Sequence, residues 1–215
     1  MEQYAKSRRV AVIDSCGMTT LGLQHLFSAL EGGIYKLRFF SSGQVWFSQC
    51  GHQSYDIVIY SVAGGRYSRQ QSGHFLSRLA AALPETKRVL LAENERQASF
   101  IQPLLPVALH AVLCQSSSME QLGAQIHSVM KQEHRQTLVQ GTNAHGLSPT
   151  ERRILHYMGR GYSTPEITAQ MGRNIKTIRA HKFNVMSKLG VKSDAWLICA
   201  ADVLDYLPLP LTNGA

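Results

Sequence analysis

The segment from Asn174 to Gly190, NIKTIRAHKFNVMSKLG, decides the fold of the C-terminal part of the chain. Its apolar residues recur at broadly helical spacing and form one stripe that can be buried, namely Ile175, Ile178, Phe183, Val185, Met186 and Leu189. The polar residues between them supply cations and amides. A helix of this kind, placed after a shorter helix and a tight turn, suits the major groove of DNA. A solvated amphipathic surface helix is the alternative interpretation.

Short polar stretches on either side of this segment predict three more helices. Residues 147–151 (LSPTE) and 163–166 (STPE) each combine a capping serine, a proline suited to the first turn and a glutamate that completes a capping box. The second stretch begins a short helix that closes at Gly172, and Ser193 is expected to cap a fourth helix over 194–206. The sequence therefore predicts an all-α unit of four helices with a helix-turn-helix inside it.

Positive charge is concentrated around the same segment. The chain has 215 residues and a formal net charge of +8, and nine Lys and Arg but only two acids lie between Thr150 and Lys192. This excess favours a polyanion such as double-stranded DNA as the partner. No apolar run approaches the length of a membrane span, and the first residues do not resemble a signal peptide. We therefore expect a cytoplasmic, nucleoid-associated protein that does not bind membranes.

The N-terminal part alternates apolar strands with helical segments. The predicted strands are Arg9–Asp14, Tyr35–Phe40, Tyr55–Tyr60, Lys87–Leu91 and Leu109–Leu113. The predicted helices span 18–30, 44–50, 73–83, 95–105 and 118–132. Five such pairs predict an α/β domain with a five-stranded parallel sheet of flavodoxin-like topology. Functional side chains in such a sheet lie at the carboxyl ends of the strands.

Residues at those strand ends resemble the phosphorylation pocket of bacterial receiver domains, but the pocket is degenerate. By this resemblance, a working receiver has two acids after strand one, an aspartate after strand three, Ser or Thr after strand four and lysine after strand five. The corresponding residues here are Asp14, Ser15, Ser61, Ala92 and Cys114. One carboxylate alone holds Mg²⁺ poorly, and Ser61 cannot form an acyl phosphate. We expect no catalytic residues, no metal site and no cofactor.

The C-terminal helices resemble the DNA-binding domain of the LuxR/NarL family. The resemblance rests on LSPTERRIL (147–155), GYSTPEITAQM (161–171) and NIKTIRAHKFNVMSKLGV (174–191). It implies that the helix beginning near Asn174 reads DNA and that the fourth helix supplies a dimer contact.

The resemblance also implies individual roles for the residues of this segment. Those placed near bases or adjacent phosphates are Lys176, Thr177, Arg179, Ala180 and Phe183, and an arginine can bind guanine bidentately. Those expected on phosphates are Arg173, Lys176, Lys182, Lys188 and Lys192, with Ser163 and Thr164 as further donors. Asn174 caps the helix and completes the set. His181 and Phe183 could equally belong to the core.

The sequence divides into four regions under this interpretation. We expect an atypical receiver-like domain over 1–131, a polar linker over 132–146, a LuxR-type helix-turn-helix domain over 147–207 and a flexible tail over 208–215.

The combination of a degenerate receiver domain and an intact helix-turn-helix domain predicts a non-enzymatic activator that binds specific DNA sites independently of phosphorylation. It resembles auxiliary regulators that form a heterodimer with an RcsB-like response regulator, although self-pairing and contact with RNA polymerase remain open. Two alternatives are a phosphorylation-switched response regulator and a protein-interaction adaptor without specific DNA binding. The sequence shows no P-loop, dinucleotide fingerprint or nucleophile elbow, which disfavours an enzyme.

Overall fold

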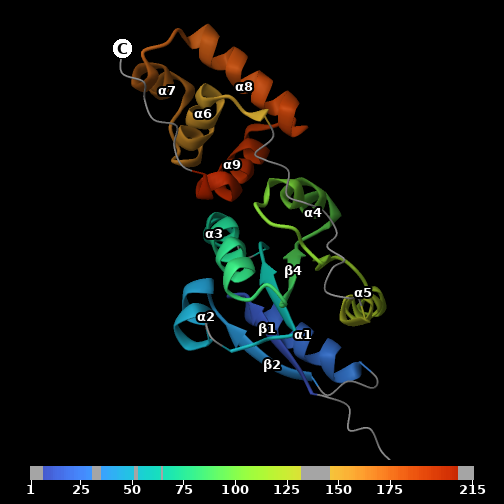
Figure 1. The fold of residues 1–215 in the computed structure, drawn as a ribbon. Helices are drawn as coiled ribbons and strands as arrows, with labels where there is room; N and C mark the ends of the chain where they lie inside the picture. The colour runs from blue at the N-terminus through green and yellow to red at the C-terminus, as the bar shows by residue number, and fades with distance from the viewer. Residues whose placement is uncertain (1–6, 31–34, 51–52, 64, 132–145, 208–215) are drawn as a thin grey trace, which may run out of the picture.

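A parallel sheet forms the centre of the N-terminal half (Figure 1). The computed structural model describes residues 7–30, 35–50, 53–63, 65–131 and 146–207. Its strands are β1 (Arg8–Ile13), β2 (Tyr35–Phe40), β3 (Ile57–Ser61), β4 (Lys87–Ala92) and β5 (Ala111–Cys114). They lie in the order β2-β1-β3-β4-β5, which is the flavodoxin-like order, so the predicted α/β fold class is confirmed.

Helices cover both faces of this sheet. They are α1 (Gly17–Ala29), α2 (Gly43–Cys50), α3 (Arg66–Ala82), α4 (Glu95–Ile101) and α5 (Met119–Lys131). The side chains of α1 and α5 pack with one set of strand residues, and those of α2, α3 and α4 pack with the other. All five residues of β3 are buried because helices lie on both sides of it.

Four helices build the C-terminal half: α6 (Pro149–Gly159), α7 (Thr164–Met171), α8 (Ile175–Leu189) and α9 (Asp194–Val203). A short 3₁₀ helix (Leu204–Tyr206) follows α9. Both predicted capping boxes are present, Ser148 with Glu151 and Ser163 with Glu166. Ser193 occupies the N-cap position of α9 as predicted, but its side chain makes no capping hydrogen bond.

Three helices differ from their predicted bounds by three or more residues. Helix α4 ends at Ile101, four residues before the predicted end, and continues as a 3₁₀ helix (Gln102–Leu104). Helix α3 begins at Arg66, seven residues before the predicted start, because its first two turns lack an apolar stripe. The fourth predicted helix ends at Val203 and tightens into the 3₁₀ helix. The predicted tail and residues 132–145 of the predicted linker lie outside the described residues. No helix within the described ranges is long and apolar enough to cross a membrane.

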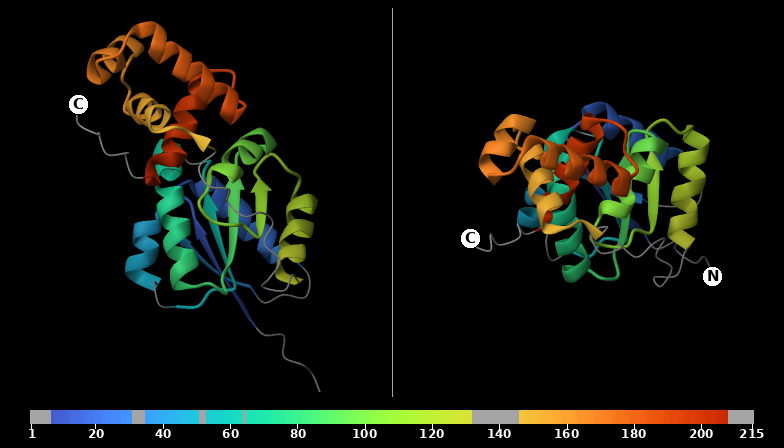
Figure 2. Two further views of the ribbon diagram at one scale, coloured as in Figure 1. Left: turned by 45° about the horizontal axis from the view of Figure 1, so that its top comes forward. Right: turned by 90° about the horizontal axis from the view of Figure 1, so that it is seen from above.

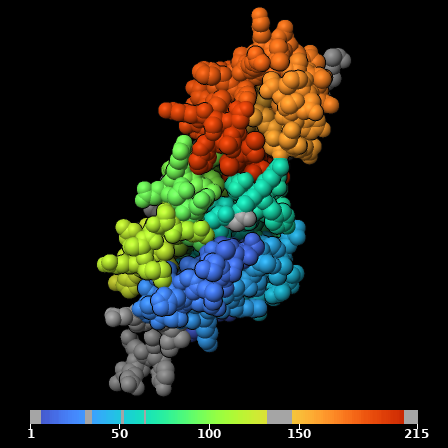
Figure 3. All heavy atoms as spheres, turned by 180° about the vertical axis from the view of Figure 1, so that it is seen from behind, coloured from blue at the N-terminus to red at the C-terminus, as the bar shows by residue number. Residues whose placement is uncertain are grey.

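The two halves pack against each other where α3 and α4 meet α9 (Figures 2 and 3). The ring of Tyr206 lies against Gly73, and its hydroxyl donates to the Leu104 carbonyl at 3.0 Å. A Cβ at position 73 would lie 2.2 Å from the Tyr206 ring, so this approach requires glycine. The N-terminal half therefore fixes the position of α9, and α8 lies on the outer side.

Candidate nucleic-acid interface

Helix α8 is bounded by two local signals that the sequence contains. The Asn174 side chain accepts a hydrogen bond from the Lys176 backbone N–H at 2.8 Å, which satisfies one of the free donors at the helix start. Gly190 ends the helix in the left-handed conformation with φ 66°. Ile178 and Val185 bury the inner side of α8 against α6 and α7. The rest of the helix is free to carry function.

The outer face of α8 is exposed and follows helical spacing. Its exposed residues are Lys176, Arg179, Ala180, Phe183, Asn184 and Ser187. Phe183 is 71% exposed, which excludes it from the core and favours the base-contact interpretation. His181 is half-buried beside this face. Exposure of a large apolar side chain to water is unfavourable. Between cations on an otherwise polar helix face, such a side chain can instead contact a thymine methyl group of DNA.

The cations of this region fall into two groups. Lys188 Nζ lies 2.7 Å from Glu151 Oε2 and 3.1 Å from the Gly146 carbonyl, and Lys182 Nζ lies 2.6 Å from Asp194 Oδ2. No carboxylate within the described ranges pairs with the other four cations, which are Arg173, Lys176, Arg179 and Lys192. The unpaired group can approach phosphates without first breaking an ion pair.

The Glu151 carboxylate is a structural centre of this half. Its other partner is the Ser148 backbone N–H at 2.7 Å, so it joins the start of α6 to the end of α8. Burial by itself raises the pKa of Glu151, but hydrogen bonds from Lys188 and Ser148 outweigh burial and hold the pKa below its ordinary value. Glu151 therefore acts as a cap and an ion-pair partner at once.

The polar groups of Ser163, which caps α7, are already bonded within the chain. The Ser163 hydroxyl donates to Glu166 Oε2 at 2.6 Å, and the hydrogen bonds from Ser163 lower the pKa of Glu166. The Ser163 proton is therefore already used within the chain. Thr164 begins α7 and is half-buried, and its carbonyl accepts from the Thr168 hydroxyl at 2.8 Å.

The residues of the degenerate phosphorylation pocket gather at the carboxyl edge of the sheet. Ser61 ends β3 and pairs in register with Leu91, and Ala92 ends β4 opposite Cys114. Asp14 follows β1, and its Oδ1 accepts from the Cys16 backbone N–H at 2.7 Å. Burial raises the pKa of the Cys114 thiol, with the charge of Glu95 adding to it, which disfavours the thiolate. No group of three or more potential metal ligands occurs in the described part of the chain.

Sequence reasoning counted Asn184 and Ser187 among the polar residues of α8 but assigned neither of them a contact with DNA. They lie on the turns that follow Ala180 and Phe183, and both are exposed polar residues. Helical spacing from Thr177 and Ala180 could have identified them, since positions three and four apart share a face.

Comparison with known proteins identifies relatives of both halves. Residues 145–201 match the family of bacterial regulatory proteins called the luxR family. The chain is 41% identical over 204 residues to the transcriptional activator protein BglJ of Escherichia coli (strain K12), which covers 93% of this chain and 91% of that protein. Over 125 residues it is 25% identical to the transcriptional regulatory protein UhpA of the same strain, covering 55% of this chain and 63% of UhpA.

Solved structures resemble this one along nearly its whole length. RcsB from Salmonella enterica serovar Typhimurium, bound to promoter P1flhDC with the phosphomimetic BeF3⁻, superimposes with a TM-score of 0.71 at 17% identity. That superposition covers 93% of this chain and 100% of RcsB. At this level of identity the likeness concerns the fold, which joins a receiver-like sheet domain to a helical DNA-binding domain.

Proposed function

This chain belongs to the luxR family of bacterial regulatory proteins, and we propose that it binds specific DNA sites without phosphorylation, as a heterodimer with an RcsB-like response regulator. The family consists of transcription regulators and not of enzymes. The observation that carries the proposal is the exposed outer face of α8, where cations flank Phe183 and none of the described helices or strands of the N-terminal half packs over them.

Within this face we assign readout and positioning to different residues. Arg179, Ala180 and Phe183 are assigned to base edges, with Lys176 and Thr177 on bases or the adjacent phosphates. The phosphate contacts are assigned to Arg173, Lys182, Lys188 and Lys192, with Thr164 and Asn174 at the helix starts. Ser163 joins them only by exchanging its hydrogen bond to Glu166 for one to a phosphate. Because Lys182 and Lys188 already pair with carboxylates, we expect Arg173, Lys176 and Lys192 to contribute most of the salt dependence.

Independence from phosphorylation rests on the side chains at the sheet edge. Ser61 occupies the position of the phosphorylated aspartate, and Cys114 occupies the position of the lysine. Ser61 is 2% exposed and its hydroxyl has no hydrogen-bond partner within the described residues, so an acceptor there would be both neutral and shielded from a phosphodonor.

An uncharged face on α1 supports pairing with another protein. Helix α1 contains no Asp, Glu, Lys or Arg, yet Met18 is 78% exposed and Leu21 is 62% exposed. Met119 at the start of α5 lines the same hollow as Met18 and is 44% exposed. Contiguous apolar surface of this kind on a soluble domain is typical of a protein interface. We assign it to the response-regulator partner. RNA polymerase is a further proposed contact of the assembled complex.

Footprinting of a bound promoter with and without an RcsB-like partner tests the proposal. We expect a protected two-part site only when both proteins are present, and no protection in either condition would refute specific DNA binding. Arg179→Ala is expected to cost about 1–3 kcal/mol on that site and to relax specificity at one base pair. Leu21→Lys is expected to abolish pairing, whereas Tyr67→Lys, at another exposed apolar position on α3, is expected to preserve it.

A further inference from the structure

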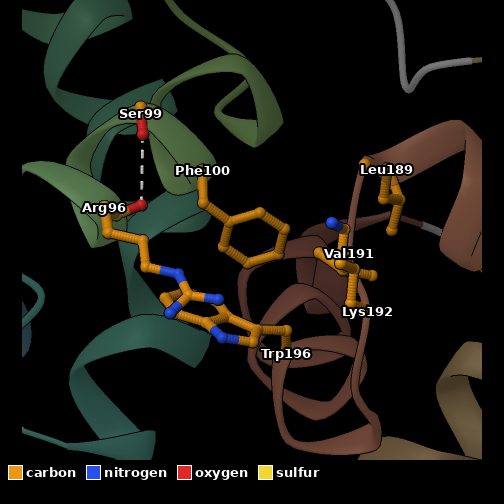
Figure 4. Close-up of a pocket in the computed structure, with 8 residues that line it drawn as sticks. Arg96, Ser99, Phe100, Leu189, Val191, Lys192 and Trp196 are labelled. Atoms are coloured by element: carbon orange, nitrogen blue, oxygen red, sulfur yellow. Dashed lines mark hydrogen bonds between the residues drawn. The ribbon is translucent and has the colours of Figure 1, made fainter.

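A groove of about 350 Å³ lies at the seam between the two halves (Figure 4). Helix α4 contributes Arg96, Ser99 and Phe100 to its lining. Residues 189–192, which end α8 and lead to α9, form the other side, and Trp196 of α9 lies at the bottom of the view in Figure 4. Each half therefore supplies part of the lining, and a molecule in the groove would contact both.

Aromatic side chains form one side of this groove. The Phe100 and Trp196 rings meet edge to face, with centroids 5.0 Å apart and an angle of 78° between their planes. The Arg96 guanidinium lies over the Trp196 ring, 5.1 Å from its centroid (Figure 4). The contact holds Arg96 at the groove and covers one face of Trp196, so a planar partner meets the Phe100 ring and the part of Trp196 that Arg96 leaves uncovered.

The electrostatics of the groove favour an anion. Arg96 comes from the N-terminal half and Lys192 from the C-terminal half, and among the described lining residues there is no carboxylate. Neither cation has a carboxylate partner in the part of the chain that the structure describes. The Ser99 hydroxyl already donates to the Arg96 carbonyl at 3.2 Å, so Arg96 and Lys192 are the groups left to bind an anion.

We propose that this groove binds a small planar aromatic anion, of the chemical class of a nucleoside monophosphate or an aryl carboxylate. The ring stacks beside Phe100 and Trp196, and the phosphate or carboxylate lies between Arg96 and Lys192. A volume of about 350 Å³ suits a molecule of this size, since ligand pockets range from roughly 300 to 1,000 Å³. Because the ligand contacts both halves, it stabilises their packed arrangement and thereby the placement of α8.

Tryptophan fluorescence of the full chain tests this site directly. The chain has two tryptophans, of which Trp46 is fully buried in the sheet domain and Trp196 lines the groove. Titration with AMP and with benzoate is expected to quench the Trp196 emission with saturation in the micromolar to millimolar range. The two probes distinguish a phosphate from a carboxylate, and Trp196→Phe should remove the response. Quenching that never saturates would overturn the proposal.

Matched probes and variants separate the ring from the charge. Cyclohexanecarboxylate carries the charge without a π face, and benzamide carries the ring without the charge, so both should bind at least tenfold more weakly than benzoate. Arg96→Met should weaken binding at least tenfold, because a charge-assisted hydrogen bond is lost. Arg78→Met is the control, since Arg78 stacks on Phe47 at 3.9 Å, a residue of the sheet domain that does not line the groove.

Three results would overturn the assignment. Equal quenching by inorganic phosphate and AMP would show that no ring is recognised. Equal affinity of Arg96→Met and Arg78→Met would remove Arg96 from the site. Equal affinity of Lys192→Gln and the parent protein for AMP would remove Lys192 from the site. AMP should also raise the melting temperature of the parent protein and leave that of folded Arg96→Met unchanged. These measurements need no operator, so they stand apart from the proposed DNA-binding function.

Discussion

Asp202 of α9 accepts a hydrogen bond from Arg69 of α3, with 3.1 Å between Oδ2 and Nη2. Its Oδ1 accepts from Arg66 Nε at 3.0 Å, and the Asp202 side chain is completely buried. One carboxylate of the DNA-binding half therefore compensates two cations of the sheet domain.

Replacing Asp202 by Asn should weaken the seam. The change keeps the shape of the side chain but leaves Arg69, which is 16% exposed, without its charge partner. We expect a loss of about 1–3 kcal/mol in the free energy of unfolding, measured by urea denaturation. Arg66→Gln should cost less than Arg69→Gln, because Arg66 is 49% exposed and water can replace its partner. Equal costs for the two arginines would contradict this.

Gly73→Ala should destabilise the protein although alanine favours a helix. The added methyl group would lie 2.2 Å from the Tyr206 ring and force the two halves apart. Gly22→Ala in α1 is the matched control, since nothing lies within 4 Å of its Cβ position. The control should stabilise by about 0.5–1 kcal/mol. Thermal unfolding of both variants gives the comparison, and a stabilised Gly73→Ala variant would show that α3 does not closely contact Tyr206.

The capping carboxylate of α6 should make the stability of the C-terminal half depend on pH. The pKa of Glu151 in the folded protein lies below the ordinary value of 4.5, so its contribution is fully present above that value. The contribution is lost as the pH falls through the lower folded pKa. Glu151→Gln should therefore flatten the acid side of the stability curve, measured by denaturation at several pH values. Exposed Glu120→Gln should leave the curve unchanged.

Acetyl phosphate with Mg²⁺ should leave the protein unmodified, because no carboxylate stands at position 61. Intact-mass spectrometry provides the measurement, with a working response regulator as the positive control. We expect Ser61→Asp to remain unmodified as well, since Ser15, Ala92 and Cys114 still lack the metal ligand, the hydroxyl and the ammonium that the transfer requires. Phosphoryl transfer to the parent protein would contradict this prediction and support the alternative that the protein is a phosphorylation-switched response regulator.

Salt dependence should separate the free cations from the paired ones. Arg173→Gln should reduce the slope of log affinity against log salt by about 1, because one phosphate contact and its released counterion are lost. Lys182→Gln should change the slope less, since Asp194 already compensates Lys182. Fluorescence anisotropy with a labelled duplex at several salt concentrations distinguishes the two, and equal slopes would show that the ion pair with Asp194 does not weaken the phosphate contact of Lys182.

Local signals account for the parts of the fold that the sequence predicts well. Apolar runs predicted the five strands, and Ser148, Ser163 and Asn174 marked helix starts correctly because capping depends on residues only a few positions apart. The first two turns of α3 were not predicted because residues 66–72 contain one aromatic residue, Tyr67, and no apolar stripe. Arg66 and Arg69 pair with Asp202, which lies far along the chain. The residue spacing within α8 could not predict that Lys188 pairs with Glu151, because tertiary packing brings these two residues together.

Tyr206 fits closely against Gly73, and the buried Asp202 binds Arg66 and Arg69. The DNA-binding half therefore has little freedom to rotate relative to the sheet domain. In any dimer built on the N-terminal halves, the distance and angle between two recognition helices then follow from how those halves pair. The half-site spacing that such a dimer tolerates on DNA is consequently set at surfaces that never touch a base pair.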